Sequence, residues 1–412
     1  MEPQGDGANA APERVGAGSW LEVLLVSLRL GLTSFGGPIA HLGYFRDEFV
    51  VRRKWLDELA YADLVALCQF LPGPASSQVG MGIGLARGGL PGALAAWVGF
   101  TIPSALALTA FGYGFSTYLS AIDQGWLHGL KVVAVAVVAQ AVWSMARNLC
   151  PDATRVSVAV GAALGVLLWP SALGQVGVIA AGGLFGLVRL RPSGELQHVP
   201  LGIRVSRTLG AAMLGLFAVL LVGLPIAVAA MQDRTLALVD SFYRSGSLVF
   251  GGGHVVLPLL QAETVFTGWV TRDAFVAGYG AAQAVPGPLF TFAAYLGTVM
   301  SQPPNGWWGG MICLVAVFLP SFLLVIGVLP FWEHLRRLRA MQSALMGVNA
   351  AVVGLLLAAL YAPVWTSAIG SPGDFGLGLV AFTLLMFWRV PPWLVVLLTA
   401  AGGAALTAGG SW

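Results

Sequence analysis

Apolar residues fill this chain in helix-length segments, and short polar or glycine-rich breaks separate them. A stretch of about 20 apolar residues crosses a bilayer as a helix, because a helix satisfies its own backbone polar groups in lipid. The pattern therefore predicts an all-α, polytopic helical membrane protein. The longer expected segments are 90–118, 126–147, 156–169, 172–188, 208–231, 307–331, 344–361, 375–388 and 392–406.

Two signatures each occur twice along the chain. The first has an arginine ahead of paired glycines, and its copies lie 215 positions apart: Arg29, Gly31, Phe35, Gly36 and Gly37, then Arg244, Gly246, Phe250, Gly251 and Gly252. The second follows at an offset of 214: Gln69, Pro72, Gly73 and Pro74, then Gln283, Pro286, Gly287 and Pro288. Matched breaks in two long halves are typical of transporters built from internal repeats.

The repeats define the expected domains. We predict a disordered tail at 1–18, an N-terminal repeat at 19–189, a cytoplasmic linker with one extra transmembrane helix at 190–232, and a C-terminal repeat at 233–412. The single extra helix reverses the direction in which the second half enters the membrane. We therefore expect inverted repeats with broken or re-entrant helices at Phe-Gly-Gly and Pro-Gly-Pro.

Loop arginines predict the orientation, because cytoplasmic loops carry an excess of lysine and arginine. With the polar stretch 189–207 in the cytoplasm, most other loop arginines fall on the same side: Arg87, Arg147, Arg155, Arg336, Arg337, Arg339 and Arg389. The prediction is a multi-pass protein of a bacterial-type inner membrane. Its N-terminus would be cytoplasmic and its C-terminus outside.

The stretch before Lys54 is the test of this topology. If 20–35 crossed the membrane fully, the basic residues from Arg46 to Lys54 would face outside, against the rule. Re-entrant hairpins remove the conflict, with tips at Gly36-Gly37 and at Pro72-Gly73-Pro74. The arms of the second hairpin, roughly 16–22 Å long, are shorter than the ~30 Å hydrocarbon core. One broken span is the alternative.

The breaks suggest anion binding. A Pro-Gly-Pro step ends one helix and lets another begin with free N–H groups and a partial positive charge. Ser76 and Ser77 follow the first break, and Thr291 is the equivalent of Ser77. With these hydroxyls, the two Pro-Gly-Pro steps, the two Phe-Gly-Gly steps and the Gln69 and Gln283 amides are predicted to form the substrate site. A plain kink with self-capping hydroxyls is the structural alternative. Arg29 and Arg244 are predicted to bind an oxyanion with their forked guanidiniums, and the alternative is shallow arginines that reach the interface.

Acidic side chains are sparse in the apolar segments. Glu48 and Glu263 are equivalent, and Asp63 lies in a hairpin arm. A carboxyl at membrane depth can couple transport to protons, or it can pair with an arginine and only hold structure. Both roles are open for these acids.

Composition further narrows the possible functional classes. Charged residues make up 9% of the chain, and the net charge of +3 with no long basic run does not suggest nucleic acid. The three cysteines are isolated, so no disulfide framework or metal cluster is expected. The predicted partners are a lipid bilayer, an anion and protons, with no cofactor, no metal and no catalytic residues. Homodimer formation is left open.

The break motifs resemble those of the chromate ion transporter family in its long, two-domain form. The resemblance rests on the stretches 32–41 and 70–78 in the first half and 250–254 and 284–288 in the second. It implies an inner-membrane carrier that exports chromate, confers chromate resistance and draws on the proton motive force. Sulfate or other oxyanion uptake, chromate–sulfate exchange and a passive channel are alternatives. An intramembrane reductase is disfavoured, since the chain lacks a nucleotide loop, a cysteine pair and a haem-ligand pattern.

Overall fold

The computed structural model describes residues 19–118, 124–192, 205–250, 253–335 and 337–408, and all regular elements in these ranges are helices. The predicted all-α fold class is therefore confirmed. Five helices in the described part are long and apolar enough to cross a membrane: Ala75–Phe115, Gly125–Leu149, Arg207–Met231, Gly306–Phe331 and Arg339–Ala368.

The first half begins with short helices. They are α1 (Trp20–Thr33), α2 (Gly37–Phe45), the π-helical η1 (Arg46–Arg52) and α3 (Glu58–Phe70). The breaks fall where glycine and proline predict them, and Ser19 and Asp57 cap α1 and α3 with their side chains. Longer helices follow: α4 (Ala75–Tyr118), α5 (Gln124–Leu149), α6 (Ala153–Leu168) and α7 (Ala172–Arg189).

The expected segment 90–118 and the hairpin arm that precedes it are joined in α4, which bends sharply at Gly88-Gly89. Gly89 has a φ of +61°, a left-handed conformation that glycine adopts without strain. Beyond the bend the chain folds back, and the backbones of Gly84 and Gly92 touch. The first arm of α4 is therefore too short to cross a ~30 Å layer alone. The predicted re-entrant hairpins stay a prediction.

The second half follows the single helix α8 (Arg207–Met231) and repeats the pattern of the first. Its first part contains α9 (Arg234–Ser247), η2 (Gly253–Val255), α10 (Val256–Thr264), α11 (Arg272–Ala282), η3 (Leu289–Thr291), α12 (Phe292–Val299) and α13 (Gly306–Val328). The chain ends with η4 (Leu329–Phe331), α14 (Trp332–Leu335), α15 (Arg339–Ala359), η5 (Leu360–Trp365), α16 (Thr366–Ala368), α17 (Pro372–Met386) and α18 (Pro392–Ala408).

The arginine signature contains a glycine that serves helix packing. A Cβ added at Gly31 in α1 would lie 2.7 Å from the backbone oxygen of Gly99 in α4. Gly246 in α9 meets the backbone oxygen of Val317 in α13 in the same way. Only a residue without a side chain lets helices approach so closely, so the same crossing is built into both halves.

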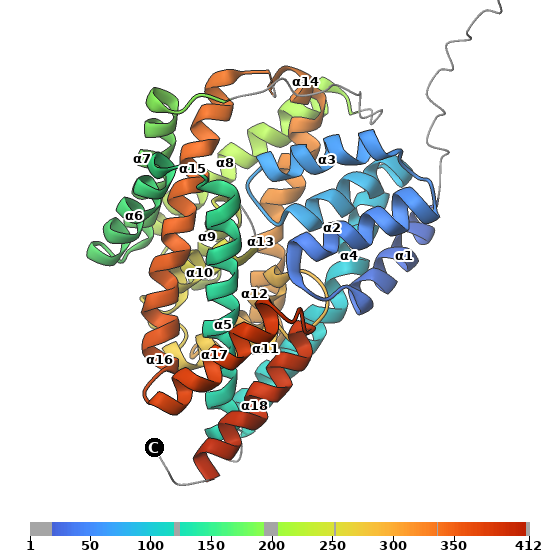
Figure 1. Cartoon of the computed structure of the whole chain (residues 1–412). Coiled ribbons are helices and arrows are strands. Elements are labelled where there is room, and N and C mark those ends of the chain that lie inside the picture. The colour runs from blue at the N-terminus through green and yellow to red at the C-terminus, as the bar shows by residue number, and fades with distance from the viewer. Residues whose placement is uncertain (1–18, 119–123, 193–204, 251–252, 336, 409–412) are drawn as a thin grey trace, which may run out of the picture.

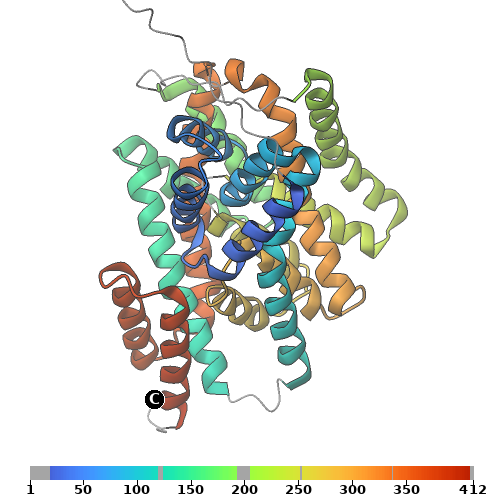
Figure 2. The same cartoon turned by 90° about the vertical axis from the view of Figure 1, so that its right-hand side faces the viewer.

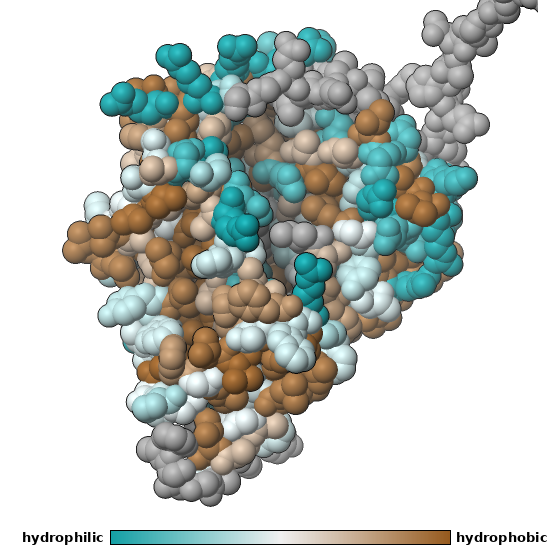
Figure 3. Space-filling view, viewed as in Figure 1, coloured by the Kyte–Doolittle hydropathy of each residue, from teal (hydrophilic) through white to brown (hydrophobic). Residues whose placement is uncertain are grey.

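The helices form a bundle with one polar end. Figure 1 shows the short helices α1–α3 and the bent α4 to one side of the long α5 and α15, and Figure 2 shows the same bundle from its side, with α17–α18 packed against α5. Hydrophilic residues gather along the top of the view and on the flank formed by α1–α3, and brown apolar surface is more frequent lower down (Figure 3). The basic ends of α7 and α15, at Arg189 and Arg339, belong to the side predicted to be cytoplasmic.

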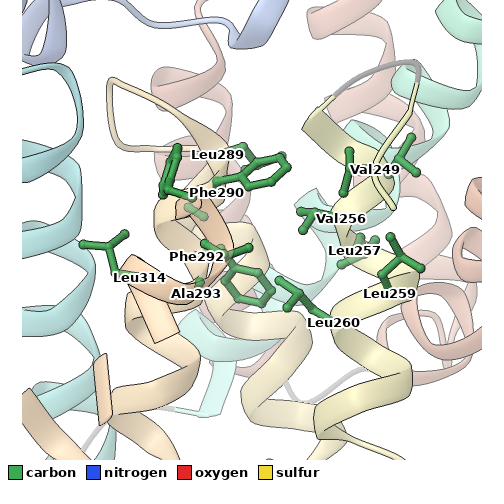
Figure 4. Close-up of a cluster of buried hydrophobic side chains, with 14 of the residues drawn as sticks. Val249, Val256, Leu257, Leu259, Leu260, Leu289, Phe290, Phe292, Ala293 and Leu314 are labelled. Carbon is green, nitrogen blue, oxygen red and sulfur yellow. The ribbon is translucent and has the colours of Figure 1, made fainter. Parts of the chain in front are cut away.

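Apolar packing fixes the position of the second break. Figure 4 shows Val249, before the Phe-Gly-Gly break, with Val256 and Leu260 of α10 facing Phe290 and Phe292 of the η3–α12 segment. All five side chains are fully buried or nearly so. Dense packing of this kind leaves the backbone at the break few alternative positions.

Candidate functional site

The two halves exchange backbone hydrogen bonds at their breaks. The Gly73 N–H donates to the Val249 carbonyl at 2.7 Å, and the Gly287 N–H donates to the Ser34 carbonyl at 2.9 Å. Ser34 and Val249 are equivalent residues, each directly before its own Phe-Gly-Gly step. Each Pro-Gly-Pro break is therefore bonded to the other half's Phe-Gly-Gly break, as an approximate two-fold axis between the halves requires.

Glycine is needed at these contacts for two reasons. Gly73 and Gly287 have φ angles of +123° and +100°, which residues with a side chain rarely adopt. An added Cβ would also lie 2.6 Å from the Ser321 hydroxyl at Gly73 and 2.8 Å from the Ser104 hydroxyl at Gly287. Ser104 and Ser321 again hold matching places, each after the proline of a long helix.

A cavity of about 510 Å³ lies beside the first-half breaks. Three residues predicted from sequence line it: Gly36, Gln69 and Gly73. In Figure 3 this face of the molecule is hollowed between α5 and the short helices α2 and α3. The volume falls in the range of ligand pockets and readily accommodates a tetrahedral oxyanion.

The rest of the polar wall comes from residues that were not predicted from the sequence to bind the anion. Gln140, Ser144 and Asn148 of α5 line the cavity, together with Asn349 of α15 and His254 of η2. The α5 residues are spaced i, i+4, i+8 and so form one polar stripe on an apolar helix. This spacing is visible in the sequence and could have predicted a polar face on this helix.

The described cavity wall mixes apolar side chains with uncharged polar groups and carries no aspartate, glutamate, lysine or arginine. Its donors are side-chain amides, a hydroxyl, an imidazole and the glycine-rich backbone. The His254 Nδ1 lies 2.6 Å from the Tyr279 hydroxyl, which fixes the ring in the wall. Such a wall can bind an anion through aligned neutral donors, without a buried counter-charge.

Both halves of the chain match the same family of known proteins. The sequence profile of chromate transporters matches residues 21–187 and again 236–404. This chain belongs to the chromate transporter family. The predicted resemblance is thus confirmed over both halves, and the chain is a helical membrane protein of this transporter family.

Relatives in this family cover the chain almost end to end. It is 28% identical to the chromate transport protein of Pseudomonas aeruginosa over 385 residues, 91% of this chain and 89% of that protein. The chromate transport protein of Cupriavidus metallidurans is 24% identical over 386 residues, covering 89% of this chain and 88% of its own length. The uncharacterized transporter YwrB of Bacillus subtilis matches 42% of this chain over 86% of its length, at 30% identity. No solved structure matches.

The two predicted arginines lie outside the lining of the cavity. The Arg29 side chain is 62% exposed, and its Nη1 lies 3.9 Å from the Glu48 Oε2. The Arg244 Nη2 lies 3.0 Å from both Asp240 Oδ2 and Glu263 Oε2. Anion binding by these arginines stays a prediction, and in this conformation both are paired with acids.

The hydroxyls after the breaks differ between the halves. Ser77 is buried without a hydrogen-bond partner, whereas the Thr291 hydroxyl donates to the Pro288 carbonyl at 2.8 Å and caps its own break. The Ser76 Oγ lies 3.3 Å from the His41 Nδ1. Helix α4 begins directly after the first break, but the 3-10 turn η3 separates the second break from α12. Only the first break therefore leads straight into an α-helix start with a free hydroxyl.

The remaining predicted site residues lie outside the cavity lining, and most of them make structural contacts. The Phe35 ring lies 6.4 Å from the Trp393 ring, and Phe250 packs against the main apolar core. The Gln283 amide nitrogen is buried without a partner. The Trp332 indole N–H donates to Asp63 at 3.3 Å, across the two halves. Gly251 and Gly252 lie outside the described residues.

Proposed function

We propose that this chain is a secondary active transporter that exports chromate across the inner membrane, driven by the proton motive force, and thereby confers chromate resistance. Family membership and two relatives named as chromate transport proteins support the cargo. The observation that carries the proposal is the cavity at the crossed breaks. It joins polar donors, broken backbone and both halves at one place, as carriers with inverted repeats do.

The position of the cavity suits entry from the cytoplasm. Its α5 wall spans Gln140 to Leu149, the end of the helix that carries Arg147 and that we predict to be cytoplasmic. In the proposed mechanism a chromate dianion enters here and meets the start of α4 near Ser77 and the Gln69 amide. Arg29 and Arg244 contribute positive potential when they exchange their acidic partners for the anion.

Release on the far side uses the symmetry of the repeats. The bonds Gly73–Val249 and Gly287–Ser34 tie each break to the opposite half, so a rotation of one half opens the equivalent surface around Gln283 and Gly287. The extra helix α8 gives the second half its inverted direction. The residues of both breaks then form one substrate site that is reached alternately from the two sides.

Sulfate uptake or chromate–sulfate exchange is the second proposal, because sulfate has the same charge and tetrahedral shape. The uncharged donors of the cavity wall suit either ion.

The test is flux of labelled chromate and labelled sulfate in proteoliposomes with imposed pH gradients. We expect chromate to accumulate uphill on the acidic side and a protonophore to abolish that accumulation. Equilibration without accumulation would indicate a passive channel. Movement of sulfate alone would favour the second proposal.

Labelling of single cysteines in a cysteine-free background tests the inverted topology. We expect Arg87→Cys to react from the cytoplasmic side and Trp269→Cys from outside. Both positions reacting from one side would exclude inverted repeats.

A further inference from the structure

A second polar site lies away from the cavity, between α9 and α10. Asp240 and Arg244 are one turn apart on α9, and Glu263 lies in the last turn of α10. One guanidinium nitrogen, Arg244 Nη2, serves both acids at 3.0 Å. The carboxyl side chains are only 7% and 10% exposed. Two acids thus share a single cation in a nearly dry environment.

The charges of this group do not balance. With both carboxyls ionised it carries one uncompensated negative charge, and a buried unpaired charge is normally neutralised by a proton. The Asp240 Oδ1 is buried and has no hydrogen-bond partner. Glu263 also lies at the carbonyl end of its helix, where the partial negative charge disfavours an ionised carboxyl.

A third residue independently points to a proton or a water at this place. Gln175 of α7 is 2% exposed, and its Nε2 donates to the Pro258 carbonyl, which leaves the Oε1 as its free end. Gln175, Arg244 and Glu263 line a cavity of about 10 Å³, close to the space one water needs. A buried acceptor without a donor fits the O–H of a protonated carboxyl or of such a water.

The surrounding helices offer no other charge to balance the pair. Helices α7, α8, α13 and α15 pack against α9 or α10, and their described residues include no Asp, Glu, Lys or His. Their arginines stand at helix ends, at Arg189, Arg207 and Arg339. Of the other titratable groups, Tyr243 of α9 donates to the Phe217 carbonyl, His254 of η2 is bonded to Tyr279, and Cys313 of α13 is a buried thiol.

We propose that Asp240 and Glu263 together hold one proton against Arg244, and that this shared site binds the proton whose gradient drives the carrier. The coupling to transport rests on the proposed function; the shared proton does not. Asp240 has no acidic equivalent in the first half, where Leu25 holds its place. The proton site therefore belongs to the second half alone.

The site is well placed to act on the cargo cavity. Helix α9 ends at Ser247, two residues before Val249, which accepts the hydrogen bond from Gly73 in the cavity wall. Helix α10 follows His254, which also lines the cavity. Loss of the shared proton strengthens the attraction of both carboxylates for Arg244 and so changes how α9 and α10 are held beside the break.

Infrared spectroscopy of the full-length protein in nanodiscs tests the shared proton without any cargo. At neutral pH we expect a carbonyl stretch from a protonated carboxylic acid. Asp240→Asn and Glu263→Gln should each remove the same band, because each leaves one acid balanced by Arg244. The matched control Glu48→Gln should retain it. A band unchanged in both variants, or lost in only one, would overturn the shared site.

Flux measurements then test the coupling. In proteoliposomes, Asp240→Asn should reduce gradient-driven chromate flux to the rate without a gradient, whereas chromate–chromate exchange should persist. Glu263→Gln provides a second variant if Asp240→Asn inserts poorly. Unchanged gradient-driven flux in both would overturn the coupling role. If the wild type moves no chromate, the proposed function fails while the infrared result still decides the proton site.

Discussion

Around Glu48 the first half gathers three arginines, whereas around the equivalent Glu263 the second half gathers one arginine and a second acid. Glu48 accepts from Arg53 at 2.7 Å and Arg52 at 3.0 Å, with Arg29 at 3.9 Å. In the second half Thr267 and Gly268 stand where Arg52 and Arg53 would be. One repeated acid is therefore over-neutralised and its equivalent under-neutralised.

The two halves differ in these charged clusters, but their backbones are alike at the breaks. Gly73 and Gly287 share a left-handed conformation and matching bonds to the opposite half. Reciprocal bonds constrain both partners at once, because a change in one break would leave the other half's carbonyl unpaired. The charged side chains have no such mutual constraint, so they can differ between the two halves.

Removal of the shared cation, Arg244, is expected to cause the largest loss of stability. Arg244→Gln leaves Asp240 and Glu263 buried without a counter-charge, which costs about 3–5 kcal/mol of stability for a buried pair. Arg29→Gln should cost less than about 1 kcal/mol, because Arg29 is mostly exposed and Glu48 keeps two other arginines.

Thermal unfolding in detergent measures the difference between these two variants. If Arg29 and Arg244 also bind the cargo, both variants should lose most chromate flux, and lysine at either site should retain part of it. Equal thermal stability of the two glutamine variants would contradict the contrast between the two acid clusters.

The next effect concerns the matched breaks. Gly73→Ala and Gly287→Ala force a side chain into left-handed backbone, at about 1–3 kcal/mol of strain, and against a serine hydroxyl. Both should lose most transport at normal membrane abundance, because both breaks belong to one site. Gly43→Ala in α2 is the control, since an added Cβ there meets nothing within 4 Å. Loss in only one of the two break variants would argue against a shared site.

A smaller effect should separate the two glutamines. Gln69 lines the cavity, but Gln283 is not among its lining residues. Gln69→Ala removes a donor to a charged ligand and should weaken chromate binding about tenfold. Gln283→Ala should leave binding in this conformation unchanged and slow only the complete transport cycle. Equilibrium binding to the purified protein, beside flux in vesicles, distinguishes these outcomes.

The smallest effect is expected at the hydroxyls. Ser77→Ala removes a free hydroxyl next to the first break and should weaken chromate binding about two- to threefold. Thr291→Ser keeps the hydroxyl that caps its own break and should bind chromate like the wild type. Competition with sulfate in the same titration shows whether both ions use Ser77.

The sequence alone determined the class, the repeats and the position of each break, because these features are local. Apolar length predicts helices in a membrane, and glycine or proline ends a helix wherever it stands. Thus the ends of α1 and α3, at Thr33 and Phe70, agree closely with the breaks expected from sequence. Gly36 and Gly73 of the cavity wall were predicted from these breaks, and Gln69 from the repeated signature that contains the second break.

Only the tertiary structure decided which distant residues meet. Sequence periodicity does not reveal that Gly73 bonds to Val249, or that the stripe from Gln140 to Asn148 faces the same cavity. These contacts depend on how closely whole helices cross, which Gly31 and Gly246 set through backbone contact. In the sequence, Asp240 is an acid with no acidic equivalent in the first half. In the structure, α10 packs against α9, so Glu263 and Asp240 contact the same Arg244 guanidinium.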